Sequence, residues 1–381
     1  MAGSLDGIRV LDLSRFIAGP YCGMLLADMG AEVVKVETSR KGDPARVHPP
    51  LIGSESVYYQ VMNRNKLGLY LDLRSGDGKD VFWKLVEKAD VLIENYRPGT
   101  MDEMGFPWEK LSAVNPRLIL ARISGAGQTG PEARQPYFDV IAQAISGLMS
   151  LTGSKDGPPM RSGVYLSDYV SGIYTALGIT AALTARHATG RGQIVDTSLL
   201  DTDLSLLLTA IPEYRMQNRE ATRGGNRDRY SAPTSAYRTR DDVWIFIAAG
   251  NDTSFPRLCR AMGRPEIVSD PRFDSMKTRL ANFDELEPIV AAWMATMTES
   301  EALAALAEVE VPCSRINTIG DMLKNRQVNE PGRLLEIDHP TLGKIPMHGF
   351  AVSFSDTPSQ VRRHAPELGE HTEDVLKRWL Q

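Results

Sequence analysis

The chain has 381 residues, of which 42% are hydrophobic and 24% charged, and its formal net charge is −5. This composition is typical of a globular protein long enough for two domains, and no internal repeat or low-complexity segment is present. Because the net charge is negative, we expect no general attraction to nucleic acid or to an anionic membrane, so a polyanionic ligand would need a local basic cluster.

The first residues, MAGSLDGIRVLDL, carry neither the basic region nor the apolar region of a secretory signal, so we expect a cytoplasmic protein. The three cysteines, Cys22, Cys259 and Cys313, are far apart in the sequence. Their spacing fits neither a disulfide framework nor a metal site, so we expect reduced thiols and no bound metal.

Short apolar runs alternate with stretches of helical periodicity through the first half of the chain. We expect helices at 21–30, 79–89, 140–153 and 200–211, and strands at 7–13, 31–37, 67–73, 90–95, 117–124 and 193–199. This repeated alternation predicts an α/β fold with a parallel, doubly wound sheet covered on both faces.

The loops that follow these strands are candidates for ligand binding, since ligands of open α/β sheets bind at the carboxyl ends of the strands. In SRFIAGP (14–20), Gly19 and Pro20 suit a helix start whose free N–H groups can meet an anion. The absence of a G-x-G-x-x-G pattern disfavours a nicotinamide cofactor. In NYRPGT (95–100), a simple turn and a binding role for its first three residues both remain open.

Basic residues cluster near the second and third predicted strands, either as a solvated face or as a site for an anionic ligand. They are Lys35, Arg40, Lys41, Arg46, Arg64 and Lys66.

The stretch 163–190 predicts a long buried helix that is too rich in small and polar residues for a membrane span. Asp168 stands at its start. An acid in this place can serve as the helix N-cap, as a catalytic group, or as both. Farther on, a polar segment at 212–229 predicts a linker, and 243–250 and 311–316 predict strands of a second, mainly helical unit. From about Gln327 we expect strand and loop, followed by a final helix.

Taken together, several stretches resemble the family III CoA-transferases, the group that includes formyl-CoA transferase and carnitine CoA-transferase. The resemblance runs almost from end to end, in the family's order. It is carried by SRFIAGPYCGMLLADMGAEVVKVE, MNRNK, ENYRPGTMDEMGF, SGAGQTGP, the Asp168 stretch with GRGQIVDTSLLD, RGGNR, IAAGND, VPCSRINT and APELGEHT.

The resemblance implies that Asp168 is the nucleophile and that Gly250 and Asn251, in AAGND, belong to a glycine-rich loop covering the active site. It also implies that coenzyme A or acyl-CoA binds as a substrate, with no tightly bound cofactor. The residues that it places near the nucleotide are Ile17, Ala18, Glu37, Arg40, Leu71, Asp72, Leu73, Arg74, Asn95, Tyr96 and Arg97.

The implied chemistry is transfer of CoA from an acyl-CoA to a small carboxylic acid through an aspartyl anhydride and an aspartyl-CoA thioester. We expect the helix N-terminus to favour the ionised form of Asp168, and the basic loops to meet the phosphates of CoA. The implied architecture is a Rossmann-like large domain (1–200 plus 327–381), a linker (201–224) and a smaller α/β domain (225–326), in a homodimer whose ring-like chains interlock.

Departures from the family pattern leave other readings open. Ile17 stands where formyl-CoA transferases have glutamine, and Ala126 stands where an aromatic residue is common, so the acids exchanged are not fixed. An α-methylacyl-CoA racemase is a second reading, but the segment 136–139 lacks the histidine of the racemase G-H-D motif. A non-catalytic CoA-binding protein is a third. The residues Arg223, Arg227 and Arg238 could pair with a dicarboxylate or simply be solvated.

Overall fold

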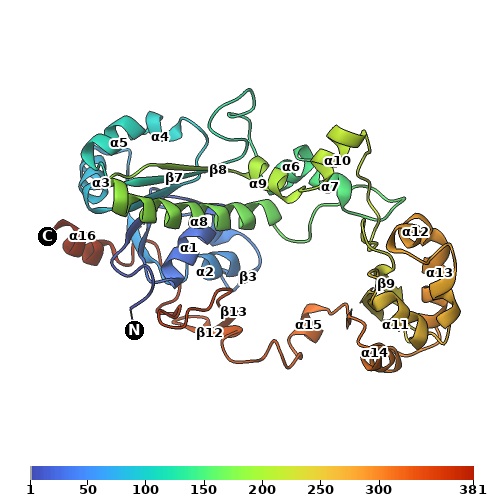
Figure 1. The fold of residues 1–381 in the computed structure, drawn as a ribbon. Helices are drawn as coiled ribbons and strands as arrows, with labels where there is room; N and C mark the ends of the chain where they lie inside the picture. Colours follow the sequence, from blue (N-terminus) through green and yellow to red (C-terminus); the bar gives the residue numbers. More distant parts are fainter. Residues whose placement is uncertain (1) are drawn as a thin grey trace. The chain divides into compact units, whose positions relative to one another are not determined.

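The computed structural model describes residues 2–381, which form two compact units (Figure 1). The first unit comprises the chain up to Met149, Arg161–Arg219 and Glu330–Gln381, and the second comprises Ser150–Met160 and Glu220–Asn329. The predicted division into two domains joined by a linker stays a prediction.

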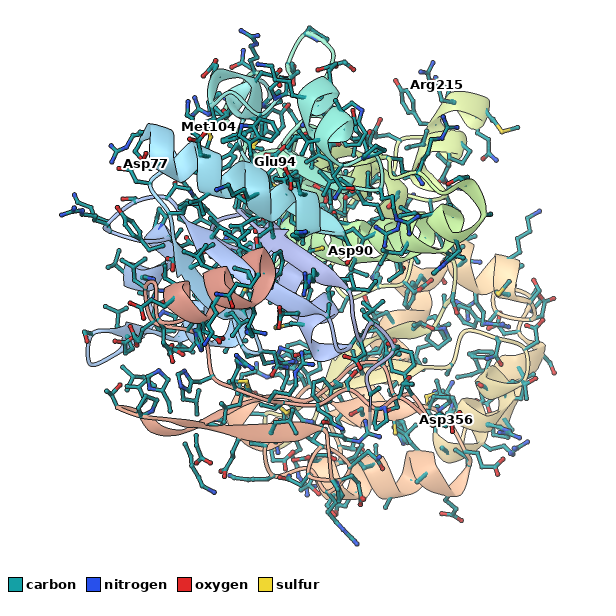
Figure 2. All side chains as sticks on the ribbon, turned by 90° about the vertical axis from the view of Figure 1, so that its left-hand side faces the viewer. Asp77, Asp90, Glu94, Met104, Arg215 and Asp356 are labelled. Carbon is teal, nitrogen blue, oxygen red and sulfur yellow. The ribbon has the colours of Figure 1, made fainter. Side chains whose placement is uncertain are left out.

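A six-stranded sheet forms the centre of the first unit, with the strand order β5-β2-β1-β6-β7-β8. Every pairing in it is parallel, so the predicted doubly wound, Rossmann-like α/β fold is confirmed. Its strands are β1 (Arg9–Asp12), β2 (Glu32–Glu37), β5 (Leu67–Tyr70), β6 (Val91–Glu94), β7 (Ile119–Ser124) and β8 (Ile194–Ser198). Asp90, just before β6, and Glu94, at its carboxyl end, are labelled in Figure 2.

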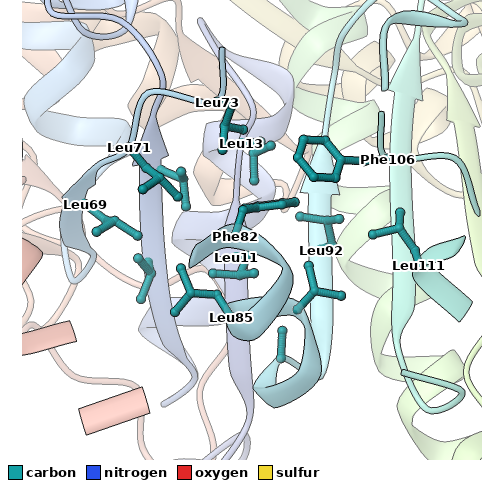
Figure 3. Packing of buried hydrophobic residues seen from close by; sticks show 14 of the residues in the cluster. Leu11, Leu13, Leu69, Leu71, Leu73, Phe82, Leu85, Leu92, Phe106 and Leu111 are labelled. Carbon is teal, nitrogen blue, oxygen red and sulfur yellow. The ribbon is translucent and has the colours of Figure 1, made fainter. Parts of the chain in front are cut away.

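Helices cover both faces of this sheet. On one face lie α1 (Ala18–Asp28) and α8 (Leu166–Thr189), and on the other α3 (Gly76–Lys88), α5 (Trp108–Val114) and the terminal helix α16 (Thr372–Leu380) (Figure 1). Adjacent strand residues point to opposite faces: Val10 packs with α1 and α8, and Leu11 packs with α3. Figure 3 shows the second of these cores, in which Phe82 and Leu85 of α3 lie against the leucines of the strands. Burial on both faces explains why the central residues of strands such as β1 and β6 are apolar on both sides.

Helix α8 packs closely against both α1 and the sheet because two glycines allow it. An added Cβ at Gly172 would lie 2.8 Å from the carbonyl oxygen of Ala18, and one at Gly178 would lie 2.6 Å from Cγ1 of Val195. The helix ends at Gly190, whose φ of 71° is the left-handed conformation of a helix C-cap. Within the described residues, no helix has the length and apolar character needed to cross a membrane.

Shorter elements connect these layers. They are the hairpin β3 (Leu51–Ile52) and β4 (Glu55–Ser56), with α2 (Val57–Met62), α4 (Thr100–Glu103), α6 (Asp139–Ile145), α7 (Leu148–Leu151), α9 (Leu199–Leu206) and α10 (Ala210–Gln217). The helix expected over 140–153 is divided between α6 and α7 by Gly147, whose φ is 89°. The helix expected over 200–211 includes most of α9, whereas all of α10 lies in the stretch 201–224 that was expected as a linker.

The second unit has a three-stranded antiparallel sheet in the order β11-β10-β9, with an apolar core against its helices. Its elements are β9 (Thr234–Arg238), β10 (Trp244–Ala248), α11 (Ser254–Ala261), α12 (Met276–Ala281), α13 (Phe283–Met294), α14 (Glu299–Glu308), β11 (Cys313–Arg315) and α15 (Ile319–Met322). Strand β9 was not predicted.

The last segment of the chain belongs to the first unit. It forms the hairpin β12 (Leu334–His339) and β13 (Gly343–His348) and ends in α16. The guanidinium of Arg362 donates to the carbonyl oxygens of Ala27 (2.6 Å) and Gly30 (3.2 Å). The ring of Trp379 is 1% exposed in the core between α3 and the sheet.

Candidate active site

The strand order reverses direction between β1 and β6, and such a switch point is where open α/β sheets bind ligands. A pocket of about 620 Å³ lies there, within the size range of ligand sites. The loops after β1, β6 and β7 and the start of α8 line it, through Arg15, Phe16, Ile17, Ala18, His48, Asn95, Tyr96, Arg97, Pro98, Ile123, Ser124, Gly125, Ala133, Gln135, Pro136, Tyr137, Phe138, Asp139, Val140, Tyr165, Asp168 and Leu199.

Six of the predicted site residues meet in this pocket. They are Ile17, Ala18, Asn95, Tyr96, Arg97 and Asp168. Although they come from three distant parts of the sequence, the topology brings them to one edge of the sheet. The amide of Asn95 also has a structural task, since its Oδ1 accepts from the N–H of Arg15 (2.7 Å) and its Nδ2 donates to the carbonyl of Arg15 (2.8 Å).

Asp168 is not the N-cap of α8. The N-cap is Tyr165, whose side chain makes no capping hydrogen bond, and Asp168 is the third residue of the helix. No residue that the structure describes donates a hydrogen bond to its carboxylate, which faces the pocket. The N-cap reading of Asp168 is therefore wrong, and its side chain is available to a ligand.

The capping task belongs to Asp139, at the start of α6. Its Oδ1 accepts from the backbone N–H of Ser167 (2.8 Å) and, at longer range, of Asp168 (3.4 Å). Its Oδ2 accepts from Nε2 of Gln143 (2.7 Å), which fixes the carboxylate in place. No local pattern in the sequence marks this cap, because Asp139 lies far from α8 along the chain.

A second buried carboxylate, Asp203 of α9, lies on the other side of Ser167. Its Oδ2 accepts from the hydroxyl of Ser167 (2.9 Å), while its Oδ1 has no partner among the described residues. Burial raises the pKa of Asp203 to about 6. Sequence analysis missed this residue because no local pattern marks it.

These surroundings make ionisation of Asp168 harder. Burial first, and then the charges of Asp139 and Asp203, raise the pKa of Asp168 to about 7. The expectation that the helix N-terminus would favour the charged form is therefore wrong in its net effect. One reason is that the nearest helix N–H groups are already bonded to Asp139.

Aromatic rings surround the start of α8. The ring centroids of Tyr58 and Tyr165 are 6.0 Å apart, those of Tyr58 and His48 are 5.4 Å apart, and those of Tyr21 and Tyr169 are 5.1 Å apart. Burial and neighbouring groups that include Asp168 raise the pKa values of Tyr58 and Tyr169, so both stay neutral hydroxyls near pH 7.

The remaining predicted nucleotide contacts lie near the ends of β2 and β5, outside this pocket. Glu37 is buried, Arg40 is exposed, and the side chains of Leu71 and Leu73 belong to the core, so only their backbone groups can face a ligand. Asp72 and Arg74 pair with each other, with Nε of Arg74 3.1 Å from Oδ1 of Asp72.

Most of the basic cluster is structural, which corrects the expectation that it meets phosphates. Four of its members are largely buried, and each forms an ion pair of 2.7 or 2.8 Å with a carboxylate inside the unit. The pairs are Lys35–Asp43, Arg46–Glu37, Arg64–Asp28 and Lys66–Asp12. The sequence could not show these pairs because the partners lie on other elements.

The cations that remain available at the pocket are Arg15 and Arg97. Neither forms an ion pair with any residue of the described chain, 2–381. The guanidinium of Arg15 stacks on the ring of Tyr96, 4.9 Å from its centroid, and donates to the hydroxyl of Thr38 (3.2 Å).

Gly250 and Asn251 belong to the second unit, at the end of β10. An added Cβ at Gly250 would lie 2.0 Å from Oγ of Ser231, so the backbone approach requires glycine. Oδ1 of Asn251 accepts from the N–H groups of Thr253 (3.0 Å) and Ser254 (2.7 Å), which caps the following helix. This loop has a defined structural role of its own, and its predicted catalytic role stays a prediction.

The three arginines considered for a dicarboxylate also lie in the second unit and already have partners there. Arg223 donates to the carbonyl of Gly157 (2.8 Å), and Arg227 and Arg238 pair with carboxylates of the same unit. Among residues 2–381, no group of three His, Cys, Asp or Glu side chains could hold a metal ion.

Comparison with known proteins shows the family of this chain. Residues 5–372 match CoA-transferase family III. The chain is 39% identical to the succinyl-CoA–D-citramalate CoA-transferase of Chloroflexus aurantiacus, over 98% of this chain and 93% of that protein. It is 36% identical to the succinyl-CoA:glutarate CoA-transferase of Mus musculus, over 99% and 86%.

A crystal structure of a CAIB/BAIF family protein from Brucella suis has the same fold, with a TM-score of 0.88 and 32% identity over the whole of both chains. Match to the family profile, identity to named transferases and likeness of fold all extend over nearly the full length. The chain therefore belongs to CoA-transferase family III and is an acyl-CoA:carboxylate CoA-transferase.

Proposed function

We propose that this enzyme transfers CoA from an acyl-CoA donor to a small carboxylic acid through covalent intermediates on Asp168. The observation that carries the proposal is the carboxylate of Asp168, which faces the pocket at the switch point of the sheet and accepts no hydrogen bond from the described residues. A carboxylate in this state is free to attack a thioester.

In the first half of the reaction, a carboxylate oxygen of Asp168 attacks the thioester carbon, the C–S bond breaks, and CoA leaves as a thiolate. The thiolate then attacks Cγ of Asp168 in the mixed anhydride, and the bond between Cγ and the bridging oxygen breaks. The donor acid leaves as a carboxylate, and an aspartyl-CoA thioester remains.

The second half runs the same two steps in reverse with a new acid. The acceptor carboxylate displaces the thiolate from Cγ of Asp168, and the thiolate then attacks the acceptor carbonyl. The products are the acceptor's CoA ester and a free Asp168 carboxylate. Neither water, proton nor electron is consumed, so the site must mainly orient the groups and exclude water.

Each tetrahedral intermediate carries an oxyanion that needs hydrogen-bond donors. The backbone N–H groups of Ile17 and Ala18 at the start of α1 suit this role, since both residues line the pocket and neither N–H has a partner among the described residues. The corresponding N–H groups of α8 are occupied by Asp139. We assign the uncompensated charges of Arg15 and Arg97 to the phosphates of CoA.

The compared transferases are named for succinyl-CoA as donor, with D-citramalate and glutarate as acceptors. These acceptors are dicarboxylic acids. We therefore propose succinyl-CoA as the donor and a dicarboxylic acid as the acceptor for this enzyme.

The nucleophile is tested by incubating the enzyme with succinyl-CoA and adding hydroxylamine, which converts an aspartyl anhydride or thioester to a hydroxamate. We expect the hydroxamate at Asp168 in peptide mass spectra and a loss of turnover of about 10⁴-fold in Asp168→Ala. Asp201→Asn, on α9 outside the pocket lining, is the matched control. Absence of both adduct and CoA exchange in the wild-type enzyme would reject the mechanism.

A panel of succinyl-, acetyl- and formyl-CoA against mono- and dicarboxylic acids tests the substrate class. Deuterium wash-in at the α-carbon of a 2-methylacyl-CoA is measured alongside it. A transferase should show none, whereas wash-in without transfer would favour racemase chemistry.

A further inference from the structure

Phe16 has a backbone conformation that aromatic residues rarely adopt. Its φ is 62°, in the left-handed region, where the Cβ of an L-residue is crowded by the backbone. Glycine would adopt this conformation without that cost. A large side chain kept at such a position, beside a ligand pocket, points to a use for the side chain itself.

Hydrogen bonds on both sides hold this conformation. The Asn95 side chain bonds both backbone groups of Arg15, at 2.7 and 2.8 Å. Oδ1 of Asp43 accepts from the N–H of Phe16 (3.2 Å), and the Asp43 carboxylate is fixed by Nζ of buried Lys35 (2.7 Å). The turn is therefore determined by groups other than the Phe16 ring, and the ring can be removed without removing its supports.

Phe16 lines the same pocket as Asp168 and is 41% exposed. The position of Phe16 relative to Asp168 follows from the packing of α8 on α1, in which Gly172 lies beside Ala18. Asp168 lies one turn before Gly172 on the same face of α8, which brings it beside the residues that precede Ala18. The ring is thus close to the place where the thioester carbon must lie.

We propose that Phe16 is a specificity-determining residue, whose ring forms the wall that limits the size of the acyl group that can reach Asp168. This inference rests on the proposed function of Asp168. Small acyl groups fit beside the ring, whereas aryl acyl groups collide with it.

The test compares phenylacetyl-CoA with succinyl-CoA as donors, using an acceptor acid that the wild-type enzyme accepts. In both Phe16→Gly and Phe16→Ala we expect the ratio of kcat/KM for phenylacetyl-CoA over succinyl-CoA to rise about 10-fold or more. The two variants open the same space but differ in strain. Phe16→Gly should therefore melt about 1–3 °C above Phe16→Ala.

Glu310→Gly is the matched control, because Glu310 also has a positive φ (53°) but does not line the pocket, so its donor ratio should stay that of the wild type. An unchanged donor ratio in active Phe16 variants, or an equal loss with both donors, would overturn the proposal. Failure of the proposed function is distinguishable from either result, since the wild-type enzyme would then form no adduct at Asp168 with any donor.

Discussion

In the proposed mechanism, Asp168 acts as a nucleophile in a place that disfavours its charge. Burial and two neighbouring carboxylates raise the pKa of this residue to about 7, so near pH 7 only about half of the molecules carry the reactive form. A carboxylate with a higher pKa is also a better nucleophile. The raised pKa of Asp168 therefore lowers the fraction of enzyme that is ionised but makes each ionised carboxylate more reactive.

The pH dependence of the reaction should report this group. Because the ionised form reacts, kcat/KM is expected to fall tenfold per pH unit below an apparent pKa of about 7 and to level off above it. Steady-state kinetics with succinyl-CoA between pH 5 and 9 provide the measurement. A profile that stays level down to pH 5 would show that Asp168 titrates like an ordinary aspartate.

Replacing Asp203 should shift the acid limb of the kcat/KM profile. Asp203→Asn keeps an acceptor for the Ser167 hydroxyl but removes a buried charge that raises the Asp168 pKa. We expect the acid limb to move to lower pH by about 0.5–1 unit. Asp201→Asn, on the same helix but exposed, should leave the limb in place. Equal shifts in both variants would contradict a specific role for Asp203.

At this scale the sequence predicted a role for Asp168 but not for its neighbours. The resemblance to the family pointed to the residue, whereas Asp139 and Asp203 reach it only through the packing of α6 and α9 against α8. The same limit applies to Lys35 and Lys66, which were expected to meet phosphates because nothing in the sequence shows that they pair with Asp43 and Asp12. Burial of a charge is a property of the fold and has no local signature.

Among the elements, the start of α8 depends on a cap supplied by another helix. Asp139→Ala would leave the buried N–H of Ser167 without its acceptor, so we expect a loss of about 2–3 kcal/mol in the free energy of unfolding. Urea denaturation followed by circular dichroism measures it. A loss below about 0.5 kcal/mol would mean that water replaces the cap.

In the second unit, one buried arginine fixes the loop after β10. Arg279 is 2% exposed and donates to the carbonyls of Gly250 (2.9 Å), Ala232 (3.0 Å) and Phe273 (3.1 Å). We expect Arg279→Met to cost about 3–4 kcal/mol, since three buried carbonyls lose their donor. Thermal melting compared with that of Arg260→Met, an exposed arginine on α11, separates this effect from a loss of charge alone. Equal melting temperatures in the two variants would contradict the role of Arg279 in fixing this loop.

The central elements could be predicted because their patterns are local. Six apolar runs gave six strands, and Gly190 marked the end of α8. Strand β9 was missed because its sequence, TSAYR, gains its stability from pairing with β10 rather than from apolar periodicity. The break between α6 and α7 was missed because Gly147 is compatible with either a helix or a turn.

For the whole molecule, the resemblance implies a homodimer, and the first unit has a surface that suits one. Apolar side chains that are 47–83% exposed occur on α8, α10 and the connection after α9, namely Ile173, Leu177, Leu208 and Met216. Light scattering after size exclusion should therefore give twice the mass of one chain. Leu177→Asp is expected to shift the mass toward the monomer, whereas Lys84→Asp on α3 should not. A monomeric wild-type protein would contradict the expectation.

The two units of the fold are not completed one after the other as the chain is synthesised. Most of the first unit is synthesised early, the whole stretch Glu220–Asn329 of the second unit comes next, and Glu330–Gln381 emerges last. Until then, the core beneath α3 lacks Trp379, and Gly68 on edge strand β5 lacks the hydrogen bonds that it exchanges with His371. The nascent protein therefore carries an open apolar face and an unpaired strand edge while its second unit is made, and it is most exposed to aggregation in that interval.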